Sequence, residues 1–140
     1  MEEYDELKQI FDELKEEHNI EEMVTFTEID IADKLKKNEM MIIKYKELYY
    51  KELNKYEILE RKMEALKGIR FKHYKFNDQH EWQKKEIEEY CFPCDEKIIA
   101  MKKLLMKQQI KVRFFDMCYR AFEKLGWSMK TFTDREMRGL

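Results

Sequence analysis

Cations and aromatic rings alternate in one stretch of the sequence, between Leu66 and Phe76. Phosphates attract cations and unstacked bases pack on flat rings, so a segment that offers both suits single-stranded nucleic acid of any sequence. Stacking of one base contributes about 1–3 kcal/mol, and each cation at a phosphate adds a salt-dependent increment. A solvated helix face whose rings belong to the core would show the same pattern. The residues predicted to bind nucleic acid are Lys67, Arg70, Phe71, Lys72, His73, Tyr74 and Lys75.

Cysteine spacing suggests other chemistry less strongly. Cys91 and Cys94 form a C-x-x-C pair, but no βαβ pattern surrounds the pair, as a thioredoxin-like redox site requires. The histidines and Cys118 do not lie at a spacing that would complete a zinc site. Three glycines are too few for a phosphate-binding loop, and no paired carboxylates stand in a catalytic context. We therefore expect no enzyme, no metal and no cofactor, with the cysteines in apolar packing.

The composition favours a nearly all-α protein of one ordinary domain. The chain has 140 residues, of which 41% are charged, and one proline and three glycines leave few places to turn. Sandwiches and parallel α/β folds need many turns, so both are disfavoured. No apolar run approaches the roughly 18 residues of a membrane span, and no secretory leader opens the sequence. These features predict a soluble, intracellular protein without a membrane partner.

Breakers and capping residues divide the sequence into expected helices. Pro93 must interrupt a helix, whereas Gly126 suits the position just after a helix ends. Gly68 either kinks the helix that contains it or ends it, and the pattern leaves both open. The expected helices are Glu2–Glu17, a long helix capped by Thr27 and ending near Tyr74, a short helix capped by Asp78 and ending at Tyr90, a long helix over Glu96–Leu125 capped by Asp95, and a short final helix that starts at Ser128.

Each long helix carries an apolar stripe that predicts a helical partner. The two stripes favour a long helical hairpin with short flanking helices. Further apolar residues lie beside both stripes, so more than one helical neighbour is expected, and hence a homo-oligomeric bundle or ring. The stripes comprise Leu35, Ile42, Tyr49, Tyr56 and Met63 with Tyr45, Leu59 and Leu66 on the first helix, and Ile98, Met101, Leu105, Val112, Phe115, Tyr119 and Phe122 on the last; Met41, Leu48, Leu104, Cys118 and Leu125 lie beside them.

The charges are distributed unevenly along the chain. Residues 1–22 hold ten acidic residues against two lysines, whereas residues 61–76 hold six basic residues against one glutamate. The acidic segment would mimic nucleic acid, dock on a basic partner or shield the basic segment, or it would simply be a loosely packed, solubilising helix. We predict an acidic N-terminal helix over residues 1–24 and a helical single-strand-DNA-binding and oligomerisation domain over residues 25–140.

Two regions of the sequence, one around Lys67–Phe71 and the other between Asp95 and Lys130, resemble the UvsY-type recombination mediators of tailed phages. The sequence Lys67-Gly68-Ile69-Arg70-Phe71, followed by the region of Tyr74, is similar to the family's Lys-Ala-Arg-Leu motif, but is one residue longer. Asp95-Glu96-Lys97 and Gly126-Trp127-Ser128-Met129-Lys130 resemble the family's C-terminal pattern, whose last glycine corresponds to Gly139. The likeness covers roughly residues 30–140, and the acidic first helix has no counterpart in it.

This resemblance implies a function and partners. Such a protein is a homo-oligomer, a hexamer or heptamer, in the host-cell cytoplasm during infection, with the C-terminal region important for assembly. It binds single-stranded DNA and helps a RecA-like phage recombinase load onto strands covered by the phage single-strand-binding protein. Two alternatives remain: a structural coiled-coil adaptor whose basic strip serves an acidic protein, and a double-strand DNA binder of helix-turn-helix type over Phe122–Met137.

Overall fold

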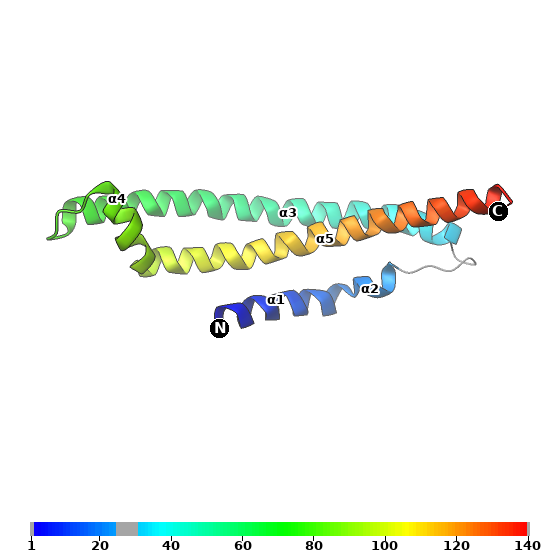
Figure 1. The fold of residues 1–140 in the computed structure, drawn as a ribbon, viewed down its shortest axis with the longest axis horizontal. Helices are drawn as coiled ribbons and strands as arrows, with labels where there is room; N and C mark the ends of the chain where they lie inside the picture. The colour runs from blue at the N-terminus through cyan, green and yellow to red at the C-terminus, as the bar shows by residue number, and fades with distance from the viewer. Residues whose placement is uncertain (1, 25–30, 140) are drawn as a thin grey trace. The chain divides into compact units, whose positions relative to one another are not determined.

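The computed structural model describes residues 2–24 and 31–139, and every regular element in them is helical (Figure 1). The expectation of an all-α chain is confirmed for these residues. In chain order the elements are α1 (Glu2–His18), α2 (Ile20–Met23), α3 (Ile31–Lys72), η1 (His73–Asn77), α4 (Lys84–Glu86), η2 (Ile87–Cys91), η3 (Phe92–Cys94) and α5 (Glu96–Met137), where η1 and η2 are π-helical turns and η3 is a 3₁₀ turn.

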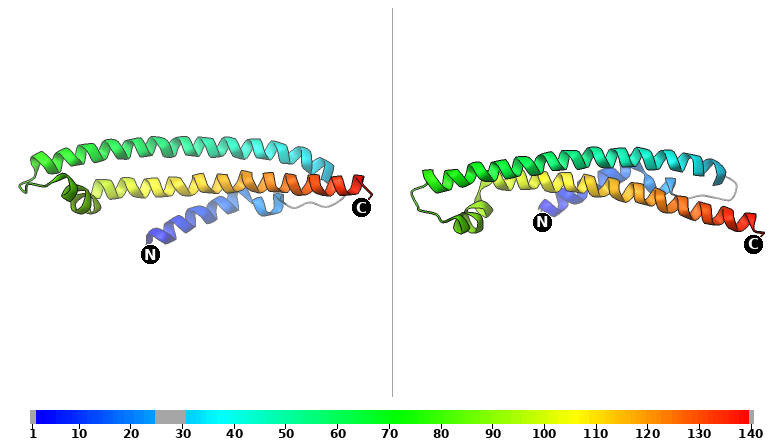
Figure 2. Two further views of the ribbon diagram at one scale, coloured as in Figure 1. Left: turned by 45° about the horizontal axis from the view of Figure 1, so that its top comes forward. Right: turned by 90° about the horizontal axis from the view of Figure 1, so that it is seen from above.

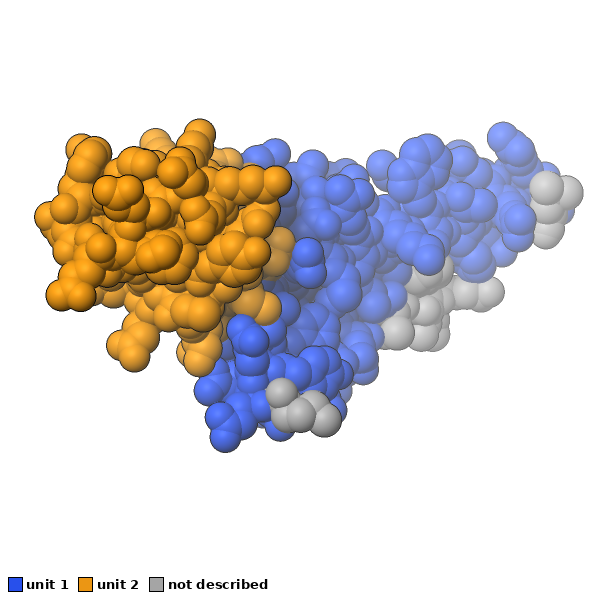
Figure 3. Space-filling view, turned by 60° about the vertical axis from the view of Figure 1, so that its left-hand side comes forward, with its two compact units in different colours: residues 1–52, 110–140 blue, residues 53–109 orange. Residues whose placement is uncertain are grey.

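The chain divides into two compact units (Figure 3). Unit 1 comprises residues 1–52 and 110–140, and unit 2 comprises residues 53–109. Within each unit, the segments of α3 and α5 that belong to it run side by side (Figures 1 and 2). The boundary predicted after residue 24 does not coincide with this division, because α1 groups with parts of α3 and α5 in unit 1.

The start of α5 is the one that the sequence predicts. Pro93 lies in the 3₁₀ turn that precedes the helix. Asp95 caps α5, because its Oδ1 accepts hydrogen bonds from the backbone N–H groups of Lys97 at 2.9 Å and Ile98 at 3.1 Å. These two donors have no partner inside the helix, so the carboxylate satisfies them.

The end of α5 differs from the prediction. The helix continues through Gly126 to Met137, so neither a helix end at Leu125 nor a new start at Ser128 exists. The Ser128 hydroxyl donates instead to the carbonyl of Lys124, one turn earlier in the same helix, at 3.1 Å. Serine is therefore accommodated inside the helix rather than at its start.

Two further boundaries also move. The helix α3 passes through Gly68 without interruption and ends at Lys72, where the π-helical turn η1 follows. The short helix α4 begins at Lys84 rather than after Asp78, and the Glu86 side chain accepts a hydrogen bond from the Gln83 backbone N–H at 3.1 Å. The predicted cap at Thr27 lies outside the described residues.

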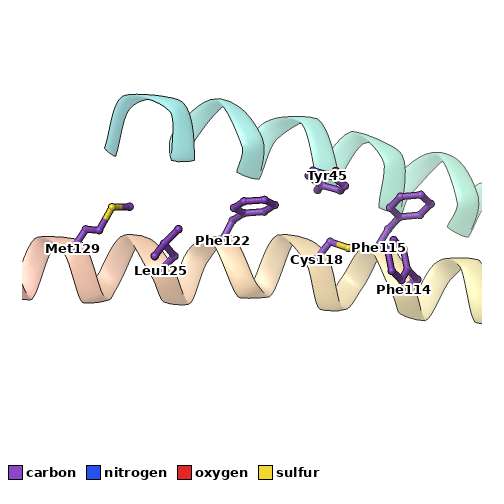
Figure 4. Packing of buried hydrophobic residues seen from close by; sticks show 7 residues of the cluster. All are labelled: Tyr45, Phe114, Phe115, Cys118, Phe122, Leu125 and Met129. Atoms are coloured by element: carbon purple, nitrogen blue, oxygen red, sulfur yellow. The ribbon is translucent and has the colours of Figure 1, made fainter. Parts of the chain in front are cut away.

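The core of unit 1 forms where α3 and α5 face each other (Figure 4). Tyr45 of α3 stacks on Phe122 of α5 with ring centroids 5.3 Å apart, and both are almost fully buried. Phe114 and Met129, which the predicted stripe did not contain, are buried as well. The complete buried cluster is Tyr45, Phe114, Phe115, Cys118, Phe122, Leu125 and Met129.

A close approach between the two long helices explains why Gly126 lies inside α5. Asn38 is buried on α3, and its Nδ2 donates to the backbone carbonyl of Phe122 at 2.8 Å. A Cβ atom at Gly126 would lie 3.0 Å from that same Nδ2. The glycine leaves room for the amide, so its role here is packing rather than helix termination.

Within unit 1, the acidic helix α1 packs against α3 and α5 through its apolar side. Phe11 makes an edge-on contact with Phe114, with ring centroids 5.8 Å apart. At the end of α1, a hydrogen bond of 3.0 Å joins His18 Nδ1 to Tyr45 Oη, and the imidazole lies 5.2 Å from the Phe115 ring. The helix is therefore held by specific packing, while its acidic residues point to solvent.

Acidification is expected to loosen α1. Burial lowers the pKa of His18, an effect that Glu17 opposes and Lys44 reinforces. Because the folded-state pKa is below 6.5, neutral His18 stabilises the fold above that pH, and the contribution is lost as the pH falls through the lowered pKa. Urea unfolding at about pH 7.5 and about pH 5.5 measures this.

The control for this experiment is a second histidine. The variant His18→Gln should lose part of the pH dependence, whereas His73→Gln, which changes an exposed side chain, should keep it. Equal pH dependence in wild type and His18→Gln would show that His18 does not hold α1.

Candidate nucleic-acid interface

The seven predicted binding residues all lie in unit 2, at the end of α3 and in η1, but they do not share one face. They separate into a buried polar cluster, the wall of a hollow and an exposed group. These groups have different partners, so only part of the predicted strip is available to a ligand.

The buried polar cluster joins α3 and η1 to the cap of α5. Arg70 Nε and Tyr74 Oη each donate to Asp95 Oδ2 at 2.6 Å. The Asp95 side chain is 1% exposed and that of Arg70 18% exposed. Both oxygens of Asp95 therefore accept hydrogen bonds, Oδ1 from the backbone of α5 and Oδ2 from the two side chains. Arg70 and Tyr74 thus have a structural role, since they hold the carboxylate that caps α5.

The charge of Asp95 is strongly stabilised. Burial alone would raise the pKa of this carboxyl, but hydrogen bonds from Tyr74 and Arg70, and from the backbone of Ile98, outweigh burial and lower the pKa to about 2. The same contact with Asp95 raises the pKa of Arg70. The pair stays ionised at neutral pH and links α3 to the start of α5 within unit 2.

Lys67 and Phe71 line a hollow of about 700 Å³ in unit 2. The Phe71 ring is half-buried there, and Lys67 Nζ lies 3.7 Å from a carboxylate oxygen of the exposed Glu64. An exposed ion pair of this kind is weak, so Lys67 is not committed to it. The other lining residues are Met63, Glu64, Gly68, Glu88, Phe92, Pro93, Ile98, Ile99 and Lys102.

The exposed group consists of Lys72, His73 and Lys75. Lys72 and His73 are exposed, and the His73 ring contacts Tyr74 edge-on at 5.3 Å. Lys75 is also exposed, and its Nζ donates to the backbone carbonyl of Trp82 at 3.1 Å. These three side chains are the part of the predicted strip that faces solvent.

Three further rings, none of them among the seven predicted binding residues, lie close to this group in the chain. Phe76 follows Lys75 and is 74% exposed. His80 and Trp82 contact each other with ring centroids 4.4 Å apart. Phe76 is the last residue of the alternating stretch, whereas Trp82 lies beyond the end of that stretch. The one sequence signal that could have pointed to Trp82 is that the chain has two tryptophans.

The cysteines show no metal-site geometry. Cys91 and Cys118 are buried and Cys94 is exposed. Burial raises the pKa of Cys118 to about 12, and burial also raises that of Cys91. Over residues 2–24 and 31–139, no group of three or more histidine, cysteine or acidic side chains is placed to hold a metal ion. The same residues contain no helix long and apolar enough to cross a membrane.

Comparison with family models, with curated proteins and with solved structures finds no match to this chain.

Proposed function

We propose that the chain is a binding and assembly protein that holds single-stranded nucleic acid at the exposed end of unit 2. The observation that carries this proposal is the grouping of Lys72, His73, Lys75 and the bare Phe76 ring within five consecutive positions. Exposed cations neutralise phosphates, and exposed rings accept unstacked bases.

We further propose that the protein acts as a recombination mediator, which loads a RecA-like recombinase onto strands covered by a single-strand-binding protein. The resemblance to the UvsY-type family supports this step. A mediator must weaken one protein coat on a strand and favour another. Several weak sites on one oligomer achieve this, since each bound site raises the effective concentration of the next.

Exposed apolar residues on unit 1 support the proposed homo-oligomer. Met40, Ile43 and Tyr50 lie along α3 at spacings of three and seven residues, and each is more than half exposed. Trp127 of α5 is 75% exposed. Large apolar side chains that repeat along a helix and remain wet suit a second copy of the chain.

Removing the two exposed lysines should weaken DNA binding. The variant Lys72→Gln with Lys75→Gln is expected to bind a single-stranded oligonucleotide about tenfold more weakly, because two phosphate contacts are lost. The slope of log affinity against log salt should flatten by about 1.4 for two contacts on a single strand. Fluorescence anisotropy at several salt concentrations, with single-stranded and duplex DNA, measures both quantities.

The matched control removes the same charge elsewhere. Lys51→Gln with Lys124→Gln changes two exposed lysines of unit 1 and should leave affinity and slope unchanged. No binding by the wild-type protein would favour the adaptor, which the exposed stripe of α3 also fits. A preference for duplex DNA would favour the helix-turn-helix alternative, although α5 continues without a turn through Gly126.

A further inference from the structure

We infer that Trp82 and Phe76 form a base-stacking platform in unit 2, and that unpaired bases of a single strand bind on these two rings. The inference rests on the proposed function, since it names the part of that site that contacts bases. Neither ring is among the seven predicted binding residues, although Phe76 is the last residue of the alternating stretch.

Trp82 is held in place by three neighbours. Its Nε1 donates to Asp78 Oδ2 at 2.9 Å, its backbone carbonyl accepts from Lys75 Nζ at 3.1 Å, and the His80 ring lies edge-on at 4.4 Å. The hydrogen bond from Trp82 lowers the pKa of Asp78, so this acceptor remains ionised at neutral pH. An indole fixed in this way loses little freedom when a base stacks on it.

The indole is only half-buried, and no regular helix holds it. The segment from Asp78 to Gln83 has no helical hydrogen-bond pattern, so its conformation depends on the side-chain contacts of Trp82. Trp82 is therefore positioned by polar contacts at both its ring nitrogen and its backbone carbonyl.

Cations flank the platform on both sides in the chain. Lys72 and Lys75 precede Phe76, and Lys84 and Lys85 follow Trp82; all four are exposed. Lys85 makes one weak contact with Glu89, at 3.9 Å. Rings bordered by cations suit a polyanion that carries flat groups, and this favours a single-stranded nucleic acid over an acidic peptide.

The variant Trp127→Phe leaves Trp82 as the only tryptophan. Because Trp127 belongs to the exposed surface proposed to meet a second copy, the oligomer size and strand affinity of this variant are first compared with those of the wild type. We expect the fluorescence of Trp82 to fall when a single-stranded oligothymidylate binds, because a stacked base quenches an indole. An abasic oligomer of equal length, which carries the phosphates without the bases, should bind at low salt without this decrease. If the abasic strand or polyglutamate decreased the fluorescence of Trp82 as much as oligothymidylate does, the proposed stacking of bases on Trp82 would be wrong.

A second variant tests the platform at an exposed ring, whose removal should not disturb the fold. Phe76→Ala removes a ring that is 74% exposed and should weaken binding of oligothymidylate by about fivefold or more, with no effect on the abasic strand. Tyr90→Ala, which removes another exposed ring of unit 2, is the control and should change neither affinity.

The outcomes separate the two proposals. If wild-type protein binds no single strand, the proposed function fails. If it binds, while Trp82 keeps its fluorescence and Phe76→Ala binds normally, the platform alone is wrong and the strand is held by its phosphates elsewhere.

Discussion

Replacing Asp95 with alanine is expected to lower the free energy of unfolding by about 3 kcal/mol, since it removes a helix cap and leaves a nearly buried guanidinium without its carboxylate. Both oxygens of Asp95 are engaged, one by the backbone of α5 and the other by Arg70 and Tyr74. Urea unfolding followed by circular dichroism at 222 nm measures the loss.

The variant Asp95→Asn separates the cap from the charge. Asparagine caps helices as well as aspartate does, so this variant should keep the cap and lose only the ion pair, with a smaller loss than alanine. If both variants lose the same stability, the cap contributes nothing and the interpretation is wrong.

Acid unfolding tests the same carboxylate. With a folded-state pKa of about 2 against an ordinary value of 3.8, Asp95 stabilises the wild-type fold above about pH 4, and this contribution disappears as the pH falls toward 2. Asp95→Asn should show a flatter profile in that window. Because Arg70 pairs with Asp95, an Arg70→Ala variant is expected to lose stability as well. Weaker DNA binding by this variant would therefore not identify a phosphate contact.

Alanine is expected to have opposite effects at two helical glycines. At Gly68 nothing lies within 4 Å of an added Cβ, so Gly68→Ala should stabilise the fold by about 1 kcal/mol through the helix propensity of alanine. At Gly126 the added Cβ would press on Asn38, and Gly126→Ala should destabilise by about 1 kcal/mol as the hydrogen bond to Phe122 is disturbed. Thermal and urea unfolding of both variants check the signs.

A second background tests the cause. In Asn38→Ala protein the obstructing amide is gone, so Gly126→Ala should become neutral or stabilising there. If Gly126→Ala still lowered the stability of Asn38→Ala protein, the Asn38 side chain would not be the reason that glycine is needed at position 126.

Local signals predicted where α1 and α5 begin, at Glu2 and Glu96. Pro93 and Asp95 act through residues that are at most three positions away, and the sequence contains those residues in order. The helix end predicted at Gly126 is wrong because the partner of this glycine is distant in the sequence. A glycine that ends a helix and a glycine that admits a side chain from another helix look alike in sequence, and Asn38 lies 88 positions earlier.

The contacts of Arg70 and Tyr74 were not foreseen for a similar reason. Arg70 and Tyr74 fit a nucleic-acid strip by type and spacing, but their partner Asp95 lies more than twenty positions later. Asp95 was assigned to the helix cap alone, although a carboxylate has a second oxygen. Phe114 was not in the predicted stripe, and in the structure its ring packs against Phe11 of α1. Met129 was left out because the last long helix was expected to end at Leu125, whereas α5 continues to Met137.

The amide of Asn38 has one unmatched atom, because no described group donates to its Oδ1. Apolar stripes that repeat every seven residues fit one another almost equally well after a slip of seven. Such a slip would bring the amide toward position 119 or 133, where tyrosine and threonine have side chains in the space that Gly126 leaves open. The shifted pairings of α3 with α5 are therefore less stable than the native pairing. Asn38, although it lowers the stability of the apolar contact between the two helices, favours one alignment of the helices over the others.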